Sequence, residues 1–303
     1  MTAAWSGKIN DKRFGEDTMT VTTKPFRLAA SLLIATLAWL GGIPAAQAQK
    51  AGDNVVALGW FHIRTAGNSG PFTTSVIDVP INGPLGLPSS FSAPGSSIST
   101  SNADTVGLTF SHFFTDHIAL ATVGGIPPKF KLYGHGNLIP PGPAGALGQQ
   151  PLGDANINPI ISSARQWSPA AMVQYHFFEP TARVRPFIGI GVSYNFFTNI
   201  ELNPAFAASV NNNLGATLAA GAGKPGPTSV EAKASNAFAP VFNLGGSFAI
   251  TDQWGLSASV TYIPLKTTSS MVIKASDGTV LSTSKASLSP NPVIVFVAAT
   301  YKF

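Results

Sequence analysis

The chain has 303 residues, of which 10% are charged and none is cysteine, and its formal net charge is +5. A soluble domain carries about 25% charged residues, so an ordinary soluble domain is disfavoured, and the lack of cysteine excludes cysteine catalysis and thiolate metal ligands. The first 48 residues hold five basic and three acidic side chains, which leaves 13 basic and 10 acidic residues, or +3. Such a mild excess, without a basic patch interleaved with aromatics, argues against nucleic-acid binding.

The first 48 residues have the parts of a secretory signal peptide. A charged region with Lys24 and Arg27 precedes an apolar core at 28–40 and a small-residue cleavage site that ends at Ala48. The apolar core is short for a transmembrane helix, so we expect export and cleavage rather than a retained anchor. The polar stretch before Met19 indicates that Met19 is the true start.

The remaining chain alternates strand-like runs with connections of two lengths. The runs cover residues 54–65, 105–114, 118–133, 166–178, 186–200, 236–250, 254–274 and 291–303. Long connections at 66–104, 134–165 and 201–235, rich in small residues and Gly or Pro, alternate with tight links. Bacterial outer-membrane barrels have an even strand number, short periplasmic turns and long external loops. Residues 49–303 are therefore predicted to form an all-β, eight-stranded antiparallel transmembrane barrel with long external loops.

Side chains within these runs alternate in polarity as a barrel requires. One face of the last run is apolar throughout (Val293, Val295, Val297, Ala299, Tyr301 and Phe303), and the other carries Ile294 and Phe296 before turning polar. Lipid offers no hydrogen bonds, so the strands must close on themselves with apolar residues outward. The same alternation places Phe187, Ile294 and Phe296 in the lumen. Tyr301 and Phe303 are predicted to form the C-terminal signal that the barrel assembly machinery reads.

The five histidines do not indicate a metal site. His62, His112, His117, His135 and His176 lack spacings such as HExxH. His62 shares its strand face with Arg64, and we predict both as polar lumen or interface residues; the alternative is a pH-sensitive lumen contact. No serine has the context of a catalytic triad. We therefore expect no enzyme activity, no cofactor and no metal.

Four stretches, at 106–120, 185–197, 250–265 and 299–303, resemble the OmpW family of small outer-membrane barrels. The resemblance implies a narrow, apolar lumen that passes small hydrophobic molecules and is closed by an apolar constriction. A leucine of that constriction matches Val123, which keeps the apolar character. A tryptophan partner matches Thr261, which does not. Phe187 and Phe296, which face the lumen by alternation, are expected to supply aromatic bulk instead.

We therefore predict an outer-membrane channel for the passive passage of small hydrophobic molecules. Its expected partners are outer-membrane lipid, small hydrophobic solutes and the barrel assembly machinery. Two alternatives remain open at this point. One is a plugged structural barrel whose long external loops bind at the cell surface. The other is a soluble, lipocalin-like periplasmic carrier, against which the apolar face of residues 188–196 argues.

Overall fold

The structure is a computed structural model that describes residues 49–303. The predicted signal peptide, its cleavage after Ala48 and the proposed start at Met19 lie outside the described residues. Within residues 49–303, no helix is both long and apolar enough to cross a membrane.

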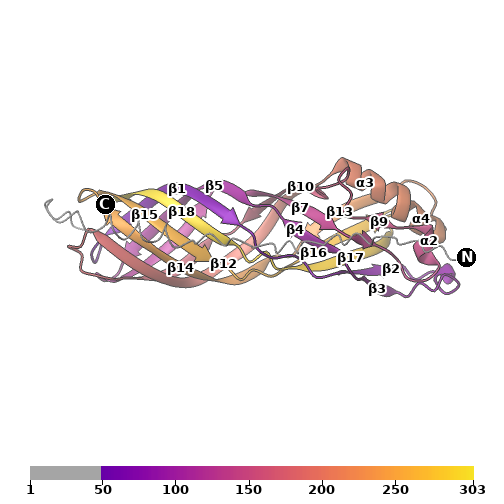
Figure 1. Cartoon of the computed structure of the whole chain (residues 1–303), viewed down its shortest axis with the longest axis horizontal. Coiled ribbons are helices and arrows are strands. Elements are labelled where there is room, and N and C mark those ends of the chain that lie inside the picture. Colours follow the sequence, from indigo (N-terminus) through magenta and orange to yellow (C-terminus); the bar gives the residue numbers. More distant parts are fainter. Residues whose placement is uncertain (1–48) are drawn as a thin grey trace, which may run out of the picture. The chain divides into compact units, whose positions relative to one another are not determined.

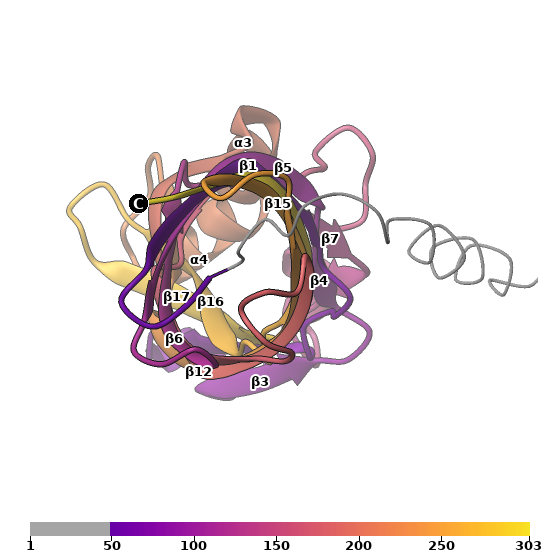
Figure 2. The same cartoon turned by 90° about the vertical axis from the view of Figure 1, so that its left-hand side faces the viewer.

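Eight strands close into an antiparallel barrel, which confirms the predicted fold. They are β1 (Asn54–Arg64), β5 (Ala103–Phe113), β6 (Ile118–Gly125), β11 (Ala170–His176), β12 (Val184–Leu202), β14 (Ala237–Ala249), β15 (Trp254–Tyr262) and β18 (Val293–Lys302). Each strand pairs with the next, β11 pairs with β12, and β18 returns to β1, so no barrel strand is left as an edge. The end-on view shows the resulting closed ring (Figure 2).

The barrel wall follows the predicted alternation of side chains. Its outer face carries exposed aliphatic and aromatic residues, among them Leu58, Leu108, Ile190, Leu244, Leu256 and Val297. The inner face carries small residues and a few large ones, and Ala57, Ala121, Phe187, Ser247, Phe296 and Ala298 are all buried. Lipid solvates the first set, while the second set fills a lumen that is narrow in any eight-stranded barrel.

Short turns close one end of the barrel. Two of them begin with Thr-Asp, and the threonine hydroxyl accepts a hydrogen bond from the first strand residue after the turn: Thr115 from the Ile118 N–H and Thr251 from the Trp254 N–H, both at 2.9 Å. Side-chain acceptors of this kind stabilise tight turns. At the same end Asn54 and Phe303 exchange backbone hydrogen bonds of 3.1 and 2.9 Å.

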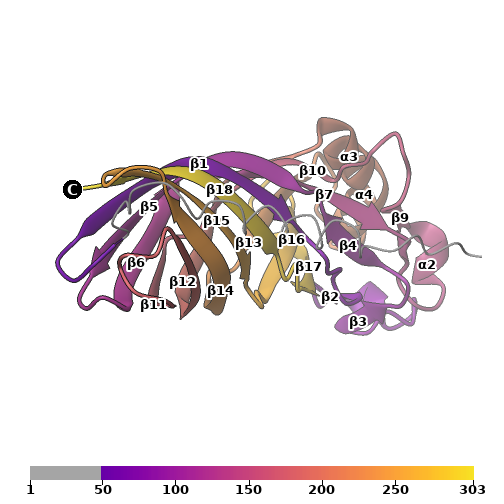
Figure 3. The same cartoon turned by 60° about the vertical axis from the view of Figure 1, so that its left-hand side comes forward.

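At the other end, the segments between β1 and β5, β6 and β11, β12 and β14, and β15 and β18 fold into what we call the extension (Figures 1 and 3). The fourth of these segments was not among the three long connections that we predicted. Its strands are β2 (Phe72–Val76), β3 (Ser90–Ala93), β4 (Ser97–Thr100), β7 (Lys129–His135), β8 (Asn137–Leu138), β9 (Gln150–Pro151), β10 (Ile161–Trp167), β13 (Ser229–Ala234), β16 (Thr267–Lys274) and β17 (Val280–Leu288). Its helices and helical turns are η2 (Pro80–Asn82), α2 (Ala144–Leu147), α3 (Pro204–Val210), η3 (Asn211–Gly215) and α4 (Ala216–Gly221). The long connections, predicted as external loops, therefore contain strands and helices of their own.

Two sheets build most of the extension. β12 runs past the barrel and pairs with β10, β10 pairs with β7, and β7 pairs with β4. A separate sheet has the order β13-β16-β17-β2-β3. Two predicted runs are thereby split: residues 118–133 become β6 and β7, and residues 254–274 become β15 and β16. Proline explains both breaks, because Pro127, Pro128 and Pro264 have no N–H to donate to a ladder.

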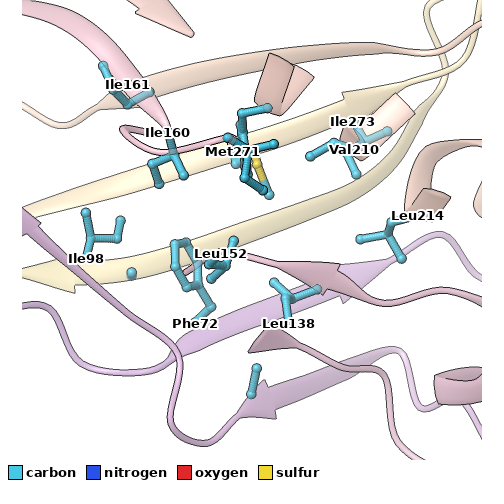
Figure 4. Close-up of a cluster of buried hydrophobic side chains, with 14 of the residues drawn as sticks. Phe72, Ile98, Leu138, Leu152, Ile160, Ile161, Val210, Leu214, Met271 and Ile273 are labelled. Carbon is cyan, nitrogen blue, oxygen red and sulfur yellow. The ribbon is translucent and has the colours of Figure 1, made fainter. Parts of the chain in front are cut away.

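The extension has its own hydrophobic core, drawn in Figure 4. Buried residues of β2, β4, β16 and α3 meet there with residues of the 134–165 connection. Phe206, Val210 and Leu214, each four positions from the next, are all buried in it. That spacing is one face of a helix, and the Asn203 side chain caps this helix by accepting the Ala205 N–H at 2.9 Å. The Ala- and Asn-rich composition of 201–235 concealed a helical pattern.

Candidate functional site: the barrel lumen

One cavity of about 350 Å³ lies inside the barrel and continues into the extension. Apolar side chains dominate its wall, including Phe61, Ile63, Val123, Phe130, Ile294 and Phe296. Five of the seven residues predicted as lumen candidates line it: Val123, Phe187, Thr261, Ile294 and Phe296. The cavity is large enough for a small molecule of pocket-binding size.

An aromatic pair narrows the outer half of the lumen. Phe61 of β1 and Phe296 of β18 are direct cross-strand partners, and their rings stack with centroids 4.2 Å apart. The Phe61 ring lies against Gly107 on β5, where a Cβ atom would overlap the ring. Glycine is therefore required at position 107 for this ring position. Phe296 was predicted from alternation, whereas Phe61 was not.

Val123 and Thr261 lie on β6 and β15, which are opposite strands of the eight-stranded ring. Val123 packs against a buried cluster that joins Ala121 and Met172 to Val241, Ile263 and Leu265. Ile263 and Leu265 follow β15 directly. Pro264 lies between them, and both side chains pack in this buried cluster. The predictions did not include these two residues. The apolar-Pro-apolar sequence directly after a predicted strand could have indicated them.

A polar strip interrupts the apolar wall on β11, β14 and β15. The Gln174 side-chain amide donates to Asn243 Oδ1 at 3.0 Å, and Asn243 Nδ2 donates to Thr261 Oγ1 at 2.9 Å. Gly189 lies between Gln174 and Asn243, and its lack of a side chain lets them meet over β12. Thr261 therefore contributes a hydroxyl to a hydrogen-bonded strip of the wall, not aromatic bulk.

A second aromatic group lies nearer the end with the short turns. The His176 ring is 4.8 Å from that of Phe113 and 4.9 Å from that of Phe187. The Phe187 ring lies over Gly245, as Phe61 lies over Gly107. Among the described residues, neither ring nitrogen of His176 has a hydrogen-bond partner. By register, Phe187 lies on one line across the strands with the Phe61–Phe296 pair, through Gly245 and Ser259, and the polar strip lies two residues further from the short turns.

Arg185 closes the lumen at the turn end. Its side chain is fully buried. It donates to the backbone carbonyl oxygens of Gln49, Asp116 and Phe177. Because the acceptors belong to the N-terminal segment and to two turns, one guanidinium ties three parts of the barrel floor together. Guanidinium carries five donors in a fixed fork, which suits this task. No role was predicted for Arg185.

His62 and Arg64, predicted as polar lumen or interface residues, do not line the lumen cavity, so their place among the lumen candidates is corrected. On β1 the odd-numbered residues Phe61 and Ile63 line the cavity, and the even-numbered ones point outward. His62 Nδ1 lies 2.9 Å from Asp104 Oδ1 on the outer surface, and Trp60 Nε1 donates to the same oxygen at 3.1 Å. The polar character of His62 and Arg64 reflects their position at the outer end of the barrel.

The wall has a weak point between β6 and β11. Their ladder ends at the Val123–Ala170 pair. Beyond it the next connection is the Gln166 N–H, which donates to the Pro128 carbonyl at 3.1 Å. Pro127, Pro128 and Pro169 all lie in this interval and line the cavity. Ile126, which is 64% exposed, lines it as well. The cavity therefore borders the interval in which the β6–β11 ladder is interrupted.

The predicted C-terminal signal residues lie at the turn end of the barrel. Tyr301 packs against Trp254 with ring centroids 4.9 Å apart, and its ring is 6.3 Å from that of Phe303. All three belong to the aromatic band expected at a membrane interface. Their role in assembly stays a prediction.

In residues 49–303, no three His, Asp or Glu side chains gather in a way that could hold a metal ion. The fold and the lumen together define a small outer-membrane β-barrel, closed at one end and extended at the other. The OmpW family model matches residues 88–303, and the chain belongs to the OmpW family. The proteins of this family are non-enzymatic membrane barrels, and this chain is located in the outer membrane of a Gram-negative bacterium.

Two curated relatives are similar in sequence. Outer membrane protein W of Vibrio cholerae is 27% identical over 203 residues, which is 67% of this chain and 75% of the relative. Outer membrane protein W of Salmonella typhimurium is 24% identical over 168 residues, 55% of this chain and 61% of the relative. Among solved structures, OprG from Pseudomonas aeruginosa matches with a TM-score of 0.60 at 18% identity, over 85% of this chain and 99% of that chain. This structural match supports the fold.

Proposed function

We propose that the protein lets small hydrophobic molecules cross the outer membrane passively through its lumen. The observation that carries the proposal is the apolar cavity of about 350 Å³, whose wall is built from Phe61, Val123, Ile294 and Phe296. Transfer of an apolar solute from water into such a space is favourable, because its apolar surface leaves its hydration shell. Water itself has no comparable driving force to enter. Two aromatic groups and a closed floor keep an open water column from forming.

The route that we propose enters through the extension and leaves sideways between β6 and β11. Support for a lateral exit comes from the interrupted ladder at Pro127, Pro128 and Pro169 and from the exposed lining residue Ile126. Support against a straight path comes from Arg185, whose hydrogen bonds close the floor. An apolar solute that leaves sideways enters lipid without passing through periplasmic water.

The proposal is tested by transfer of a solvatochromic apolar dye into liposomes that contain the purified barrel, with conductance measured in parallel. Dye transfer faster than in protein-free liposomes, together with low ion conductance, is the expected result. A barrel that transfers no dye would overturn the proposal. A variant with a bulkier lumen, Ala121→Phe, is expected to slow transfer, while the lipid-facing Ala258→Phe serves as its control.

A second candidate function is binding at the cell surface by the extension. The observation that favours it is the separate hydrophobic core of the extension, which a simple set of channel loops does not need (Figure 4). Deletion of residues 204–234 is expected to abolish such binding. If this deletion leaves dye transfer intact and removes a surface phenotype, the second candidate gains support.

A further inference from the structure

Three basic residues of the extension gather on its outer surface, close to the barrel. Lys129 and Lys131 are exposed on β7, and Arg165 of β10 is the direct cross-strand partner of Lys129. Phe130 and Ala164, which alternate with them, are buried and line the cavity. The three side chains therefore share one outer face, which we call the basic patch.

The basic patch has no acidic counterpart. Within residues 49–303, none of its three side chains takes part in an ion pair. The acidic residue nearest by register, Glu201 on β12, is opposite Ser163, further from the barrel than Arg165. Like charges directly opposite one another on adjacent strands repel. An anion bound between Lys129 and Arg165 would relieve this repulsion.

The position of the basic patch along the membrane normal indicates which anion it can meet, and the neighbouring aromatic residues show that position. Trp167 follows Arg165 on the barrel side, and its indole N–H donates to Thr198 Oγ1 at 3.2 Å. Thr198 is also the register partner of Arg165 on β12. Trp167 stacks on Phe196, with centroids 6.0 Å apart and planes 2° apart. Paired aromatic residues with a polar tip mark the interface between lipid tails and headgroups.

Arg165 is two residues beyond Trp167, which is roughly 7 Å along the strand and, for a strand tilted by about 40°, about 5 Å further from the hydrocarbon. The headgroup layer is about 5–8 Å thick on each side of a bilayer, so the basic patch lies at headgroup level. The long connections, and with them the basic patch, are on the external side in barrels of this kind. Arginine presents a fork that matches phosphate, and lysine adds a point charge.

We propose that the basic patch binds a phosphate group on a lipid headgroup of the outer leaflet. The lipid tails would lie along the exposed aliphatic wall below, and the phosphate would bridge Lys129 and Arg165, with Lys131 beside them. This inference does not depend on the proposed transport function, because the basic patch lies on the outside of the wall.

The test is native mass spectrometry of the purified barrel in detergent, titrated with lipid A, a phosphorylated glycolipid, and separately with lipid A from which the phosphates have been removed. The variant is K129Q/R165Q. The matched control is K224Q/K285Q, which removes two positive charges elsewhere on the extension. Lys285 is exposed on β17, and Lys224 forms an exposed ion pair with Asp277. Heat-modifiable electrophoretic mobility confirms that each variant is folded.

We expect wild type and K224Q/K285Q to bind lipid A equally and K129Q/R165Q to bind it roughly thirtyfold more weakly, from the loss of two basic contacts at an anionic lipid surface. The dephosphorylated lipid should bind the wild type as weakly as lipid A binds K129Q/R165Q. Equal binding of lipid A by wild type and K129Q/R165Q overturns the proposal, as does equal binding of the two lipids. Displacement of lipid A by millimolar inorganic phosphate would assign the basic patch to a free anion and also overturn it.

Discussion

Phe61 and Phe296 stack inside the lumen with ring centroids 4.2 Å apart, and they come from strands at opposite ends of the barrel sequence, β1 and β18. Their stacking therefore occurs only after the barrel has closed. Both residues line the lumen cavity. The Phe61–Phe296 contact therefore both joins the first and last strands of the barrel and narrows the lumen.

Removal of one ring of this pair should widen the lumen. We expect Phe296→Ala to raise both dye transfer and ion conductance and to lower the free energy of unfolding by about 3 kcal/mol, the lower end of the range for a buried phenylalanine because one side of the ring faces a cavity. Val297→Ala, on the lipid face of the same strand, is the control. Unchanged conductance in Phe296→Ala would show that the constriction lies elsewhere.

Gly107 offers the reverse experiment. A Cβ atom at position 107 would overlap Cε2 of Phe61, so Gly107→Ala should push the ring into the lumen. We expect slower dye transfer and a loss of about 1–3 kcal/mol in the free energy of unfolding, as for other overpacked positions. Gly124→Ala is the control, because no atom lies within 4 Å of the place that its added Cβ would occupy.

The double variant Gly107→Ala/Phe61→Ala separates the clash from a general effect of glycine replacement. It should recover dye transfer beyond the level of Gly107→Ala alone. If the double variant is as slow as the single one, displacement of the Phe61 ring does not explain the effect.

Arg185 distinguishes a lateral exit from a straight one. Arg185→Ala removes the hydrogen bonds to the carbonyls of Gln49, Asp116 and Phe177, and it should cost about 3 kcal/mol of unfolding free energy because charge-assisted hydrogen bonds are lost. Ion conductance should rise as the floor opens. If the exit is lateral, dye transfer in liposomes should stay at the wild-type rate.

An equal rise of dye transfer and conductance in Arg185→Ala would instead favour passage straight through the floor. Arg185→Lys is the companion variant. Lysine keeps the positive charge but lacks the forked set of N–H donors of the guanidinium group. Arg185→Lys should therefore lose less unfolding free energy than Arg185→Ala and show a smaller rise in conductance.

Much of the barrel could be predicted from the sequence, because membrane strands obey a strict rule. The faces of β15 and β18 follow from alternation alone. Phe187 and Phe296, which alternation assigns to the inner face, line the cavity. His62 and Arg64 show the limit of this reasoning. Their polarity was taken as a sign of the lumen, but a polar residue at the outer end of a strand can also face water or headgroups. The neighbours Phe61 and Ile63, which line the cavity, show which face of β1 is the inner one.

The extension and the floor could not be predicted in the same way. Sequence alternation gives the face of a residue but not the partners that a turn brings to it, so the three carbonyls around Arg185 were not foreseeable. Long connections were read as loops because composition outweighed pattern. The spacing of Phe206, Val210 and Leu214 was present, but the small and amide residues around it are typical of flexible segments.

The extension should lose order in acid through Glu231. Its carboxylate accepts a hydrogen bond from Lys274 Nζ at 2.6 Å, which lowers the pKa of Glu231 below the usual range, and the charge of Lys233 acts in the same direction. A lowered pKa stabilises the folded state above the unfolded-state pKa, and this contribution is lost as pH falls through the lowered value. The loss should therefore begin below the ordinary glutamate pKa.

Amide hydrogen exchange of β13, which pairs with β16, measures this loss. Corrected for intrinsic exchange, protection of β13 should fall as pH drops through the acidic range in the wild type. In Glu231→Gln it should be lower at neutral pH and flatter with pH. A wild-type profile as flat as that of Glu231→Gln would show that the ion pair does not order this strand.

Phe303 separates stability of the folded barrel from assembly in cells. Its side chain is 62% exposed, and its backbone, not its ring, is hydrogen bonded to Asn54. Phe303→Ala should therefore change the free energy of unfolding of the refolded protein by less than about 0.5 kcal/mol, as for exposed positions. If the ring is read by the assembly machinery, the same variant should be depleted from the outer membrane in cells, while Leu58→Ala, another exposed apolar truncation, should not. Normal membrane levels of Phe303→Ala would refute the assembly role, and poor refolding in detergent would assign the ring a structural role instead.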